Sequence, residues 1–240
     1  MVELKDAPSS NHDERPGPAD MIVLHYTGMQ TGAAALDRLR DPAAKVSSHY
    51  LVEEDGAVFR LVSEDRRAWH SGVSHWGGRE TLNDCSIGIE IVNPGHEWGY
   101  RAFPEAQMAA VERLVGEIIR RHEIPLERVL GHSDIAPTRK EDPGELFDWR
   151  RLAVAGLAIW TDAADEAEPG RLLDPEGFVM LSRALATCGY ELIDFQATLT
   201  AFRRRFRPAA LEGLPVMRDL LIAREIAARW PAALSDASVS

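Results

Sequence analysis

The sequence predicts an α/β domain with a central mixed β-sheet flanked by helices, followed by a small three-helix bundle. Three observations lead to this prediction. Short apolar segments typical of strands alternate with helical segments over residues 21–160. One pair of these strand segments carries a hairpin signal, which argues against an all-parallel sheet. Beyond residue 172 the pattern of apolar residues is helical throughout.

Three segments predict the first part of the sheet. Residues 21–27 (MIVLHYT) form a short apolar run that ends in polar groups, as buried strands often do. Residues 32–42 (GAAALDRLRDP) have the pattern of a helix that a proline ends. Residues 47–63 (SSHYLVEEDGAVFRLVS) contain two apolar runs around an Asp-Gly pair, which predicts a β-hairpin.

The second part of the sheet surrounds a long helix. Residues 86–93 (SIGIEIVN) alternate strictly, so three isoleucines share one face of a strand and Glu90 lies on the other. Pro104 opens an amphipathic helix. Its apolar stripe consists of Met108, Val111, Leu114, Val115, Ile118 and Ile119. Residues 128–132 (RVLGH) predict one more short strand, which ends at His132.

The chain is expected to have four parts. Residues 1–20 are polar and Pro-rich and are interpreted as a loosely held arm, and residues 21–160 form the main domain. Residues 161–172 are acidic and poor in large apolar side chains, which is typical of a linker. Residues 173–232 form the helical domain, with Phe195, Leu199, Phe202 and Phe206 in its core.

Composition excludes some functions. A net charge of −11 disfavours binding to nucleic acid, because an acidic surface repels phosphates. The basic run Arg203–Arg205 is interpreted as a solvated helix face. Cys85 and Cys188 are far apart and are expected to be small buried hydrophobic residues. No apolar run is long enough to span a bilayer, and the N-terminal segment has no apolar signal region, so the expected location is the cytoplasm.

Two histidines and an aspartate predict a metal site. His25 and His132 each end a predicted strand, and Asp142 follows His132 by ten residues across a Pro-containing loop. Two imidazoles and a carboxylate form a three-ligand set for catalytic zinc, with the fourth position left for water. The alternative for each histidine is a hydrogen-bonded residue at a strand end with no metal.

Two charged residues complete a predicted hydrolytic site. Glu90 is a lone acid in an apolar strand, and we interpret it as the general base and acid rather than as a member of a buried ion pair. Lys140 lies two residues before Asp142 and could stabilise an oxyanion, although it could also be a solvated loop charge. Asp134 is expected only to cap the turn that follows His132.

These residues stand in motifs that resemble the zinc-dependent N-acetylmuramoyl-L-alanine amidases of the type-2 class, relatives of the peptidoglycan recognition proteins. The matching segments are VLHYT, SSHYLVEEDG, AWHSGVSHWGG, SIGIEIVN, FPEAQMAAV and VLGHSDIAPTRKEDPG. They run in family order over residues 20–155. The chain looks most similar to the AmiD-like branch, whose C-terminal helical domain resembles peptidoglycan-binding modules.

The resemblance implies a fold, a cofactor and a reaction. It implies the type-2 amidase fold, with Zn²⁺ held by His25, His132 and Asp142. It also implies Glu90 as base and acid and Lys140 as the cation of the transition state. The implied reaction is hydrolysis of the amide between the lactyl group of N-acetylmuramic acid, in its ordinary or 1,6-anhydro form, and L-alanine of the stem peptide. The implied partners are peptidoglycan fragments or muropeptides, in cell-wall turnover and muropeptide recycling.

Substrate contacts are predicted from two further segments. Residues 66–78 (RRAWHSGVSHWGG) set aromatic residues among glycines, and we expect Trp69 and His70 to reach the cleft. The alternative is that Trp69 and Trp76 pin this loop to the domain. Asn93, at the end of a predicted strand, is a candidate for hydrogen bonding to the stem peptide. Two other functions remain open: a sensor that binds wall fragments without cleaving them, and a phage-type lytic amidase that acts on intact wall.

Overall fold

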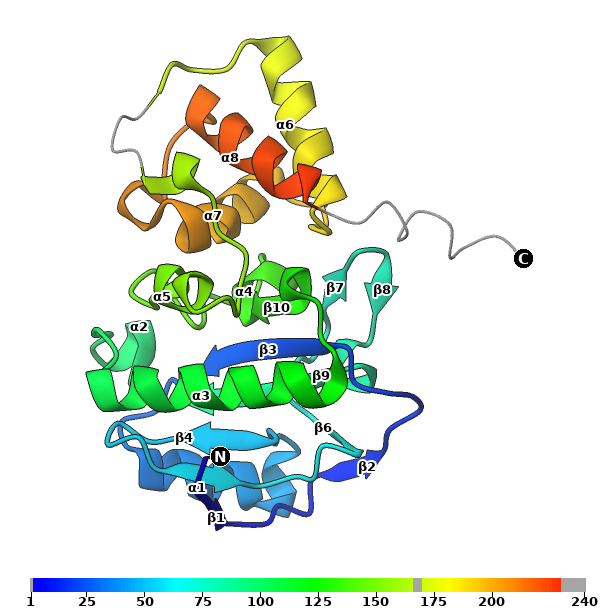
Figure 1. The fold of residues 1–240 in the computed structure, drawn as a ribbon, viewed down its shortest axis with the longest axis vertical. Helices are drawn as coiled ribbons and strands as arrows, with labels where there is room; N and C mark the ends of the chain where they lie inside the picture. The colour runs from blue at the N-terminus through cyan, green and yellow to red at the C-terminus, as the bar shows by residue number, and fades with distance from the viewer. Residues whose placement is uncertain (1, 166–169, 230–240) are drawn as a thin grey trace.

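The computed structural model describes residues 2–165 and 170–229. Its centre is a six-stranded mixed sheet with the strand order β1-β5-β4-β9-β3-β10 (Figure 1). These strands are β1 (Leu4–Asp6), β3 (Met21–Tyr26), β4 (Tyr50–Val52), β5 (Val58–Arg60), β9 (Ser86–Ile91) and β10 (Val129–Gly131). Strands β10, β3, β9 and β4 run parallel to one another, and β4 and β5 form an antiparallel hairpin. The predicted mixed sheet and hairpin are therefore confirmed.

Helix α3 (Glu105–His122) covers one face of the sheet (Figure 1). Its apolar stripe packs with Ile87, Ile89 and Ile91 of β9 in one buried cluster. The opposite face carries helix α1 (Gly32–Arg40) over Leu51. The side chains of His25 and Glu90 belong to this opposite face, because side chains alternate along a strand and their neighbours Leu24, Ile89 and Ile91 face α3.

The N-terminal residues are not a loosely held arm. Strand β1 pairs with β5 in the main sheet, and β2 (His12–Glu14) pairs with β6 (Arg66–Ala68) in a separate two-stranded sheet. The buried Ser9 hydroxyl also donates to the backbone oxygen of Leu39. Backbone pairing holds this polar segment in place, and its composition alone gave no sign of that.

Several short elements complete the domain. These are β7 (His75–Trp76), β8 (Arg79–Glu80), α2 (Gly95–Trp98), α4 (His132–Ile135) and α5 (Trp149–Val154), with 3₁₀ turns at Pro42–Ala44, Leu82–Asp84, Leu126–Arg128, Asp162–Asp165 and Pro208–Ala210. The one-turn helix α4 directly follows β10. It therefore begins at the carboxyl edge of the parallel strands, where open α/β sheets bind their ligands.

Three helices form the C-terminal part, called the helical unit below: α6 (Pro175–Thr187), α7 (Phe195–Phe206) and α8 (Met217–Ala228). The helical unit packs against the sheet domain at its β10 edge (Figure 1). One buried cluster contains Val23 and Leu130 of the sheet together with Leu199 and Phe202 of α7. The predicted bundle is confirmed, and it shares a core with the sheet domain. Residues 166–169 of the expected linker and 230–232 of the expected helical domain lie outside the described residues.

The basic run in α7 is buried, so its interpretation as a solvated face is wrong. Arg203, Arg204 and Arg205 are only 2%, 8% and 6% exposed. Arg203 forms an ion pair with the buried carboxylate of Asp219, and Arg205 forms one with Asp134 of the sheet domain. These carboxylates are distant in sequence, so the local charge pattern could not reveal them. Cys85 and Cys188 are buried free thiols, as expected.

Candidate active site

The parallel strands bring the predicted residues to one edge of the sheet. His25 on β3 and Glu90 on β9 are register partners, so their side chains leave the sheet side by side on the same face. Strand β10 lies on the other side of β3 and leads directly into His132. Residues more than one hundred positions apart therefore meet in one place because of strand order.

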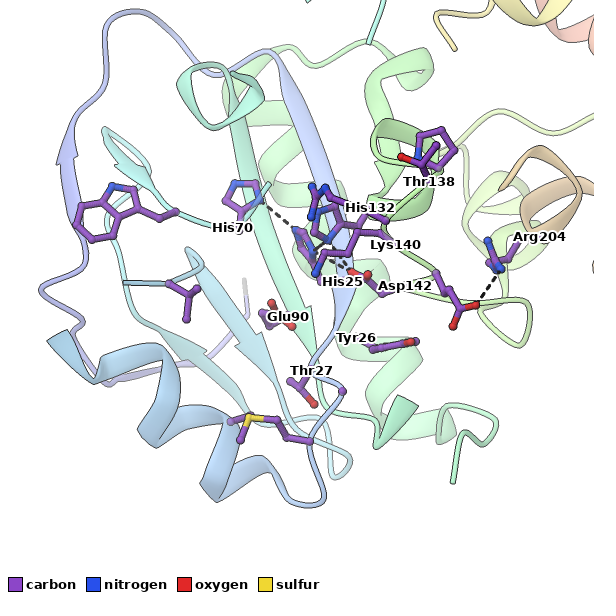
Figure 2. A pocket seen from close by; sticks show the side chains of 18 of the residues that line it. His25, Tyr26, Thr27, His70, Glu90, His132, Thr138, Lys140, Asp142 and Arg204 are labelled. Carbon is purple, nitrogen blue, oxygen red and sulfur yellow. Dashed lines mark hydrogen bonds and ion pairs between the residues drawn. The ribbon is translucent and has the colours of Figure 1, made fainter. Parts of the chain in front are cut away.

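His25, His132 and Asp142 form a compact buried cluster (Figure 2). Their side chains are 2%, 4% and 8% exposed. The Nδ1 atoms of the two histidines lie 2.9 Å apart, and each lies 3.0 Å from Oδ2 of Asp142. The structure thus unites the three predicted metal ligands around one point.

Hydrogen bonds to the Nε2 atoms of His25 and His132 determine the protonation of each ring, and so whether Nδ1 offers a lone pair to the centre of the cluster. His132 Nε2 lies 3.0 Å from the backbone oxygen of Ser71, which can only accept, so Nε2 carries the proton. His25 Nε2 lies 3.0 Å from His70 Nδ1, and His70 Nε2 lies 3.2 Å from the Ser86 hydroxyl.

The Ser86 hydroxyl fixes the rest of this chain. It donates its proton to the backbone oxygen of Leu82 at 2.6 Å, so it accepts the Nε2 proton of His70. His70 Nδ1 then accepts from His25 Nε2, which leaves the Nδ1 lone pair of His25 free to bind a cation. Gly88 makes room for this chain, because a Cβ atom there would lie 2.5 Å from Cγ of the His70 ring.

The donor set fits a cationic metal. With both Nε2 atoms protonated, two nitrogen lone pairs and a carboxylate oxygen converge, and they would repel one another without a cation between them. Burial, reinforced by the neighbouring His132, lowers the pKa of His25 to about 4, so the ring is neutral near pH 7. A neutral imidazole is the form that binds metal.

The loop that carries Asp142 is tied to the turn that carries His132. The backbone N–H of Ser133 donates to the backbone oxygen of Asp142 at 2.8 Å. Within the turn, Asp134 accepts the backbone N–H of Gly131 at 2.8 Å, which confirms its expected capping role. The two candidate ligands that flank this loop, His132 and Asp142, are thereby held together by the backbone.

Glu90 lies beside the cluster of His25, His132 and Asp142, with one oxygen free of hydrogen bonds to the described residues. Its Oε2 atom is buried and has no hydrogen-bond partner among the described residues. Burial, followed by the negative charge of Asp142, raises the pKa of Glu90 well above its ordinary value, and the positive charge of Lys140 opposes this rise. A buried carboxyl group whose pKa is raised in this way is suited to general acid and base catalysis.

These groups line a cavity of about 780 Å³. Figure 2 shows Lys140 close to His25 and His132, with Glu90 on the other side of the cluster. Lys140 and Trp69 both line the cavity. His70 lines it as well, and its ring is also hydrogen-bonded to His25, a contact that sequence reasoning did not foresee.

Helix α7 supplies a wall of the cavity that sequence reasoning missed. The lining includes Gln196, Ala197, Thr200 and Arg204 of this helix. Their spacing of three and four residues places them on one face, while Leu199, Phe202 and Phe206 face the core. This separation of polar and apolar faces was visible in the sequence, although nothing there indicated what the polar face adjoins.

The structure does not bring Asn93 to the cavity. Its side chain is 1% exposed, and its amide donates to the backbone oxygen of Arg101 and accepts from the backbone N–H of Gly95. Trp76 packs edge-on against Tyr190 of the helical unit, with ring centres 4.8 Å apart. That contact agrees with the alternative in which Trp76 pins its loop.

Comparison with known proteins identifies the family. The sequence profile described as N-acetylmuramoyl-L-alanine amidase matches residues 15–145. The chain belongs to the N-acetylmuramoyl-L-alanine amidase family. The matched region contains the clustered residues His25, His132 and Asp142 together with Glu90 and Lys140.

Two curated amidases and one solved structure show how far the likeness extends. N-acetylmuramoyl-L-alanine amidase AmiD of Escherichia coli is 36% identical over 214 residues, which cover 80% of this chain and 76% of AmiD. The 1,6-anhydro-N-acetylmuramyl-L-alanine amidase AmpD of Haemophilus influenzae is 34% identical, over 63% of this chain and 91% of AmpD. A solved complex of E. coli AmiD with anhydro-N-acetylmuramic acid-L-Ala-D-γ-Glu-L-Lys superimposes with a TM-score of 0.79 at 33% identity, covering 88% of this chain and 90% of that one.

The superposition with AmiD includes part of the helical unit. It covers 88% of this chain, which is more than the residues before α6 could supply. The expected type-2 amidase fold is therefore confirmed. Among the described residues of this amidase, no helix has the length and apolar character needed to cross a membrane.

Proposed function

We propose that the protein is a zinc-dependent amidase. It hydrolyses the amide between the lactyl group of N-acetylmuramic acid, or of its 1,6-anhydro form, and L-alanine of the stem peptide in peptidoglycan fragments. The observation that carries the proposal is the convergence of two imidazole lone pairs and a carboxylate beside the free oxygen of Glu90, within one large cavity. The names of AmiD and AmpD indicate which bond is cleaved.

Zinc fits the donor set better than calcium or magnesium, which prefer oxygen ligands only. His25 and His132 would each bind it through Nδ1, and Asp142 would bind it through Oδ2. When bound, zinc supplies Lewis-acid chemistry, which polarises a carbonyl and makes water a stronger nucleophile near neutral pH.

Glu90 would move the proton in this reaction. Its free Oε2 accepts a proton from the attacking water and later delivers it to the nitrogen of the leaving L-alanine. A carboxyl group with a raised pKa can perform both transfers, because it does not release the proton at once to solvent. The negative charge of Asp142 helps Glu90 to keep this proton.

Lys140 would stabilise the negative charge that develops on the carbonyl oxygen. It lines the cavity beside the metal ligands, and its ammonium group cannot accept a hydrogen bond, so it presents only positive charge to the substrate. A fixed cation in a partly buried site needs little rearrangement during the reaction, which is why such groups lower barriers effectively.

The cavity would hold the sugar and peptide. Its volume lies in the range of sites that enclose small ligands. Trp69 offers an aromatic surface for a sugar ring, and the polar face of α7 offers hydrogen-bonding groups to the peptide. The comparison complex of AmiD contains a ligand of this type, a muramic acid that carries a tripeptide.

The domain assignment is part of the proposal. Residues 21–160 would form the catalytic domain and residues 173–232 a domain like peptidoglycan-binding modules, joined by residues 161–172. The cytoplasmic location is likewise a prediction, which fractionation of native cells tests.

Digestion of a muropeptide mixture tests the proposed reaction directly. Purified zinc-loaded protein is incubated with muropeptides with and without 1,6-anhydro ends, and the products are identified by mass spectrometry. We expect free stem peptides that begin with L-alanine, together with the peptide-free sugars. Unchanged muropeptide masses after long incubation would contradict the proposal, and cleavage of only one class would define the preferred sugar.

A further inference from the structure

Asp134 joins two parts of the chain that are distant in sequence. Its side chain is buried, with an exposed fraction of 1%. Oδ1 accepts a 2.6 Å hydrogen bond from the hydroxyl of Tyr190, which precedes α7. Oδ2 accepts from Arg205 of α7 at 3.3 Å and from the backbone N–H of Gly131 at 2.8 Å. Two side chains of the helical unit therefore satisfy a buried carboxylate of the catalytic domain.

The turn that Asp134 caps holds the metal ligands. Gly131 is the last residue of β10, and His132 is the first residue of α4. The next backbone N–H, of Ser133, donates to the backbone oxygen of Asp142 at 2.8 Å. The position of α4 consequently determines where both His132 and Asp142 stand.

The two donors to Asp134 are themselves firmly held. The Arg205 guanidinium lies 4.1 Å from the centre of the Trp149 ring and also donates to the backbone oxygen of Val129 in β10 at 3.1 Å. The Tyr190 ring packs edge-on between Trp76 and Phe202, with ring centres 4.8 Å and 6.0 Å away. Each donor thus has a fixed direction, and Asp134 has little freedom to move relative to α7.

We infer that Tyr190 and Arg205 are positioning residues for the metal centre. Acting through Asp134, they hold α4 in the position in which His132 and Asp142 bind zinc together with His25. The inference rests on the proposed zinc chemistry and extends it, because it gives the helical unit a task at the metal site that is separate from any binding of wall polymer.

The expected effect is a loss of metal affinity. Partners that orient metal ligands from outside typically change affinity by 10-fold to 100-fold when they are removed. Tyr190 acts one step further away, through the carboxylate of Asp134, so we expect a zinc dissociation constant raised by about tenfold in Tyr190→Phe. Arg205→Lys should raise it as well, because a lysine cannot reproduce the fork of donors that Arg205 presents.

The test measures zinc affinity, not activity. Full-length protein is titrated with zinc in competition with a chromogenic chelator, and the cobalt-loaded protein is examined by visible absorption, which reports the geometry of the metal site. The matched control is Tyr50→Phe. The Tyr50 hydroxyl also donates to a carboxylate, Glu64 at 2.8 Å, but on the α3 face of the sheet, away from the ligands.

The outcomes are distinct. A raised zinc dissociation constant and an altered cobalt spectrum in Tyr190→Phe, with both unchanged in Tyr50→Phe, would support the inference. Unchanged affinity and spectrum in Tyr190→Phe, or equal losses in both variants, would overturn it. If Arg205→Lys loses its circular-dichroism signal of folded protein, Tyr190→Phe alone decides. A failure of the unaltered chain to bind zinc would overturn the proposed function itself.

Discussion

His25 and Glu90 are register partners on the adjacent parallel strands β3 and β9, and their side chains leave the sheet on the same face. This relationship sets the candidate base beside a candidate metal ligand through strand pairing alone. Strands hold catalytic groups more rigidly than loops do, because neighbouring strands fix their backbone on both sides. The strand pairing therefore holds the Glu90 side chain at a fixed place beside His25, as the proposed proton transfer requires.

Replacement of Glu90 tests its role in proton transfer. Glu90→Gln keeps the size of the side chain but removes the group that can take and return a proton. We expect turnover of a muropeptide to fall by about 10²–10⁴-fold, with zinc content unchanged by metal analysis. Activity that persists near the original level would exclude Glu90 as the base.

Lys140 is expected to affect turnover rather than metal binding. Lys140→Ala should lower kcat by about 10²–10³-fold, because it removes a cation that faces the developing oxyanion. Zinc content should remain at one ion per chain. Lys5→Ala is the matched control, since Lys5 is exposed on β1, far along the sheet from β10. Comparable decreases of kcat in the two variants would mean that Lys140 has no specific role in the reaction.

The hydrogen-bond chain behind His25 predicts a second determinant of zinc affinity. Ser86→Ala removes the acceptor for the Nε2 proton of His70, so His70 no longer has a fixed tautomer to orient His25. We expect the zinc dissociation constant to rise by about 10-fold. Ser48→Ala is the control. Ser48 is also fully buried, and its hydroxyl donates to the backbone oxygen of Tyr50, but it takes no part in the hydrogen bonds that link Ser86, His70 and His25. Equal zinc affinities of the two variants would contradict the tautomer assignment.

Acid stability should depend on Glu64. Burial opposes its ionisation, but hydrogen bonds from Arg121, His122 and Tyr50 outweigh burial and lower the pKa of Glu64 to about 2. A carboxylate whose pKa is lower in the folded chain than in the unfolded chain stabilises the fold above the unfolded value, and this contribution is lost as pH falls. The free energy of unfolding should therefore drop between pH 4.5 and pH 2, by about 1.4 kcal/mol for each unit of pKa difference.

Urea unfolding at a series of pH values measures this dependence. The variant Glu64→Gln has no carboxylate to protonate, so its free energy of unfolding should change less over the same range. A parallel pH dependence in both proteins would show that other carboxylates dominate the acid response.

Elements with a local signal could be predicted from the sequence. The alternation in residues 86–93 gave both the strand β9 and the face on which Glu90 lies, and the Asp-Gly pair gave the hairpin of β4 and β5. The convergence of His25, His132 and Asp142 could be predicted as well, since each histidine lies at or next to the end of a strand and Asp142 follows His132 by ten residues. That these three side chains bind a metal stays a prediction.

Features that depend on contacts between distant segments could not be predicted. The Arg203–Arg205 run resembles a solvated face until Asp219 and Asp134 are placed beside it. His70 lines the cavity, as its prediction as a substrate contact requires, and that contact stays a prediction. Its hydrogen bond to His25 depends on Gly88 and Ser86 of β9, which the sequence around His70 does not indicate. Asn93 follows β9 by two residues at the expected edge, yet its amide is hydrogen-bonded to the backbone of Arg101 and Gly95.

Titration of the metal-stripped protein with zinc, followed by the rate of cleavage of the muramoyl–L-alanine amide, tests the central claim most directly. The proposed function predicts no cleavage before zinc is added and a rate that rises in proportion to zinc until one ion per chain is bound. Cleavage at full rate in the stripped protein, or no cleavage at any zinc concentration, would contradict it.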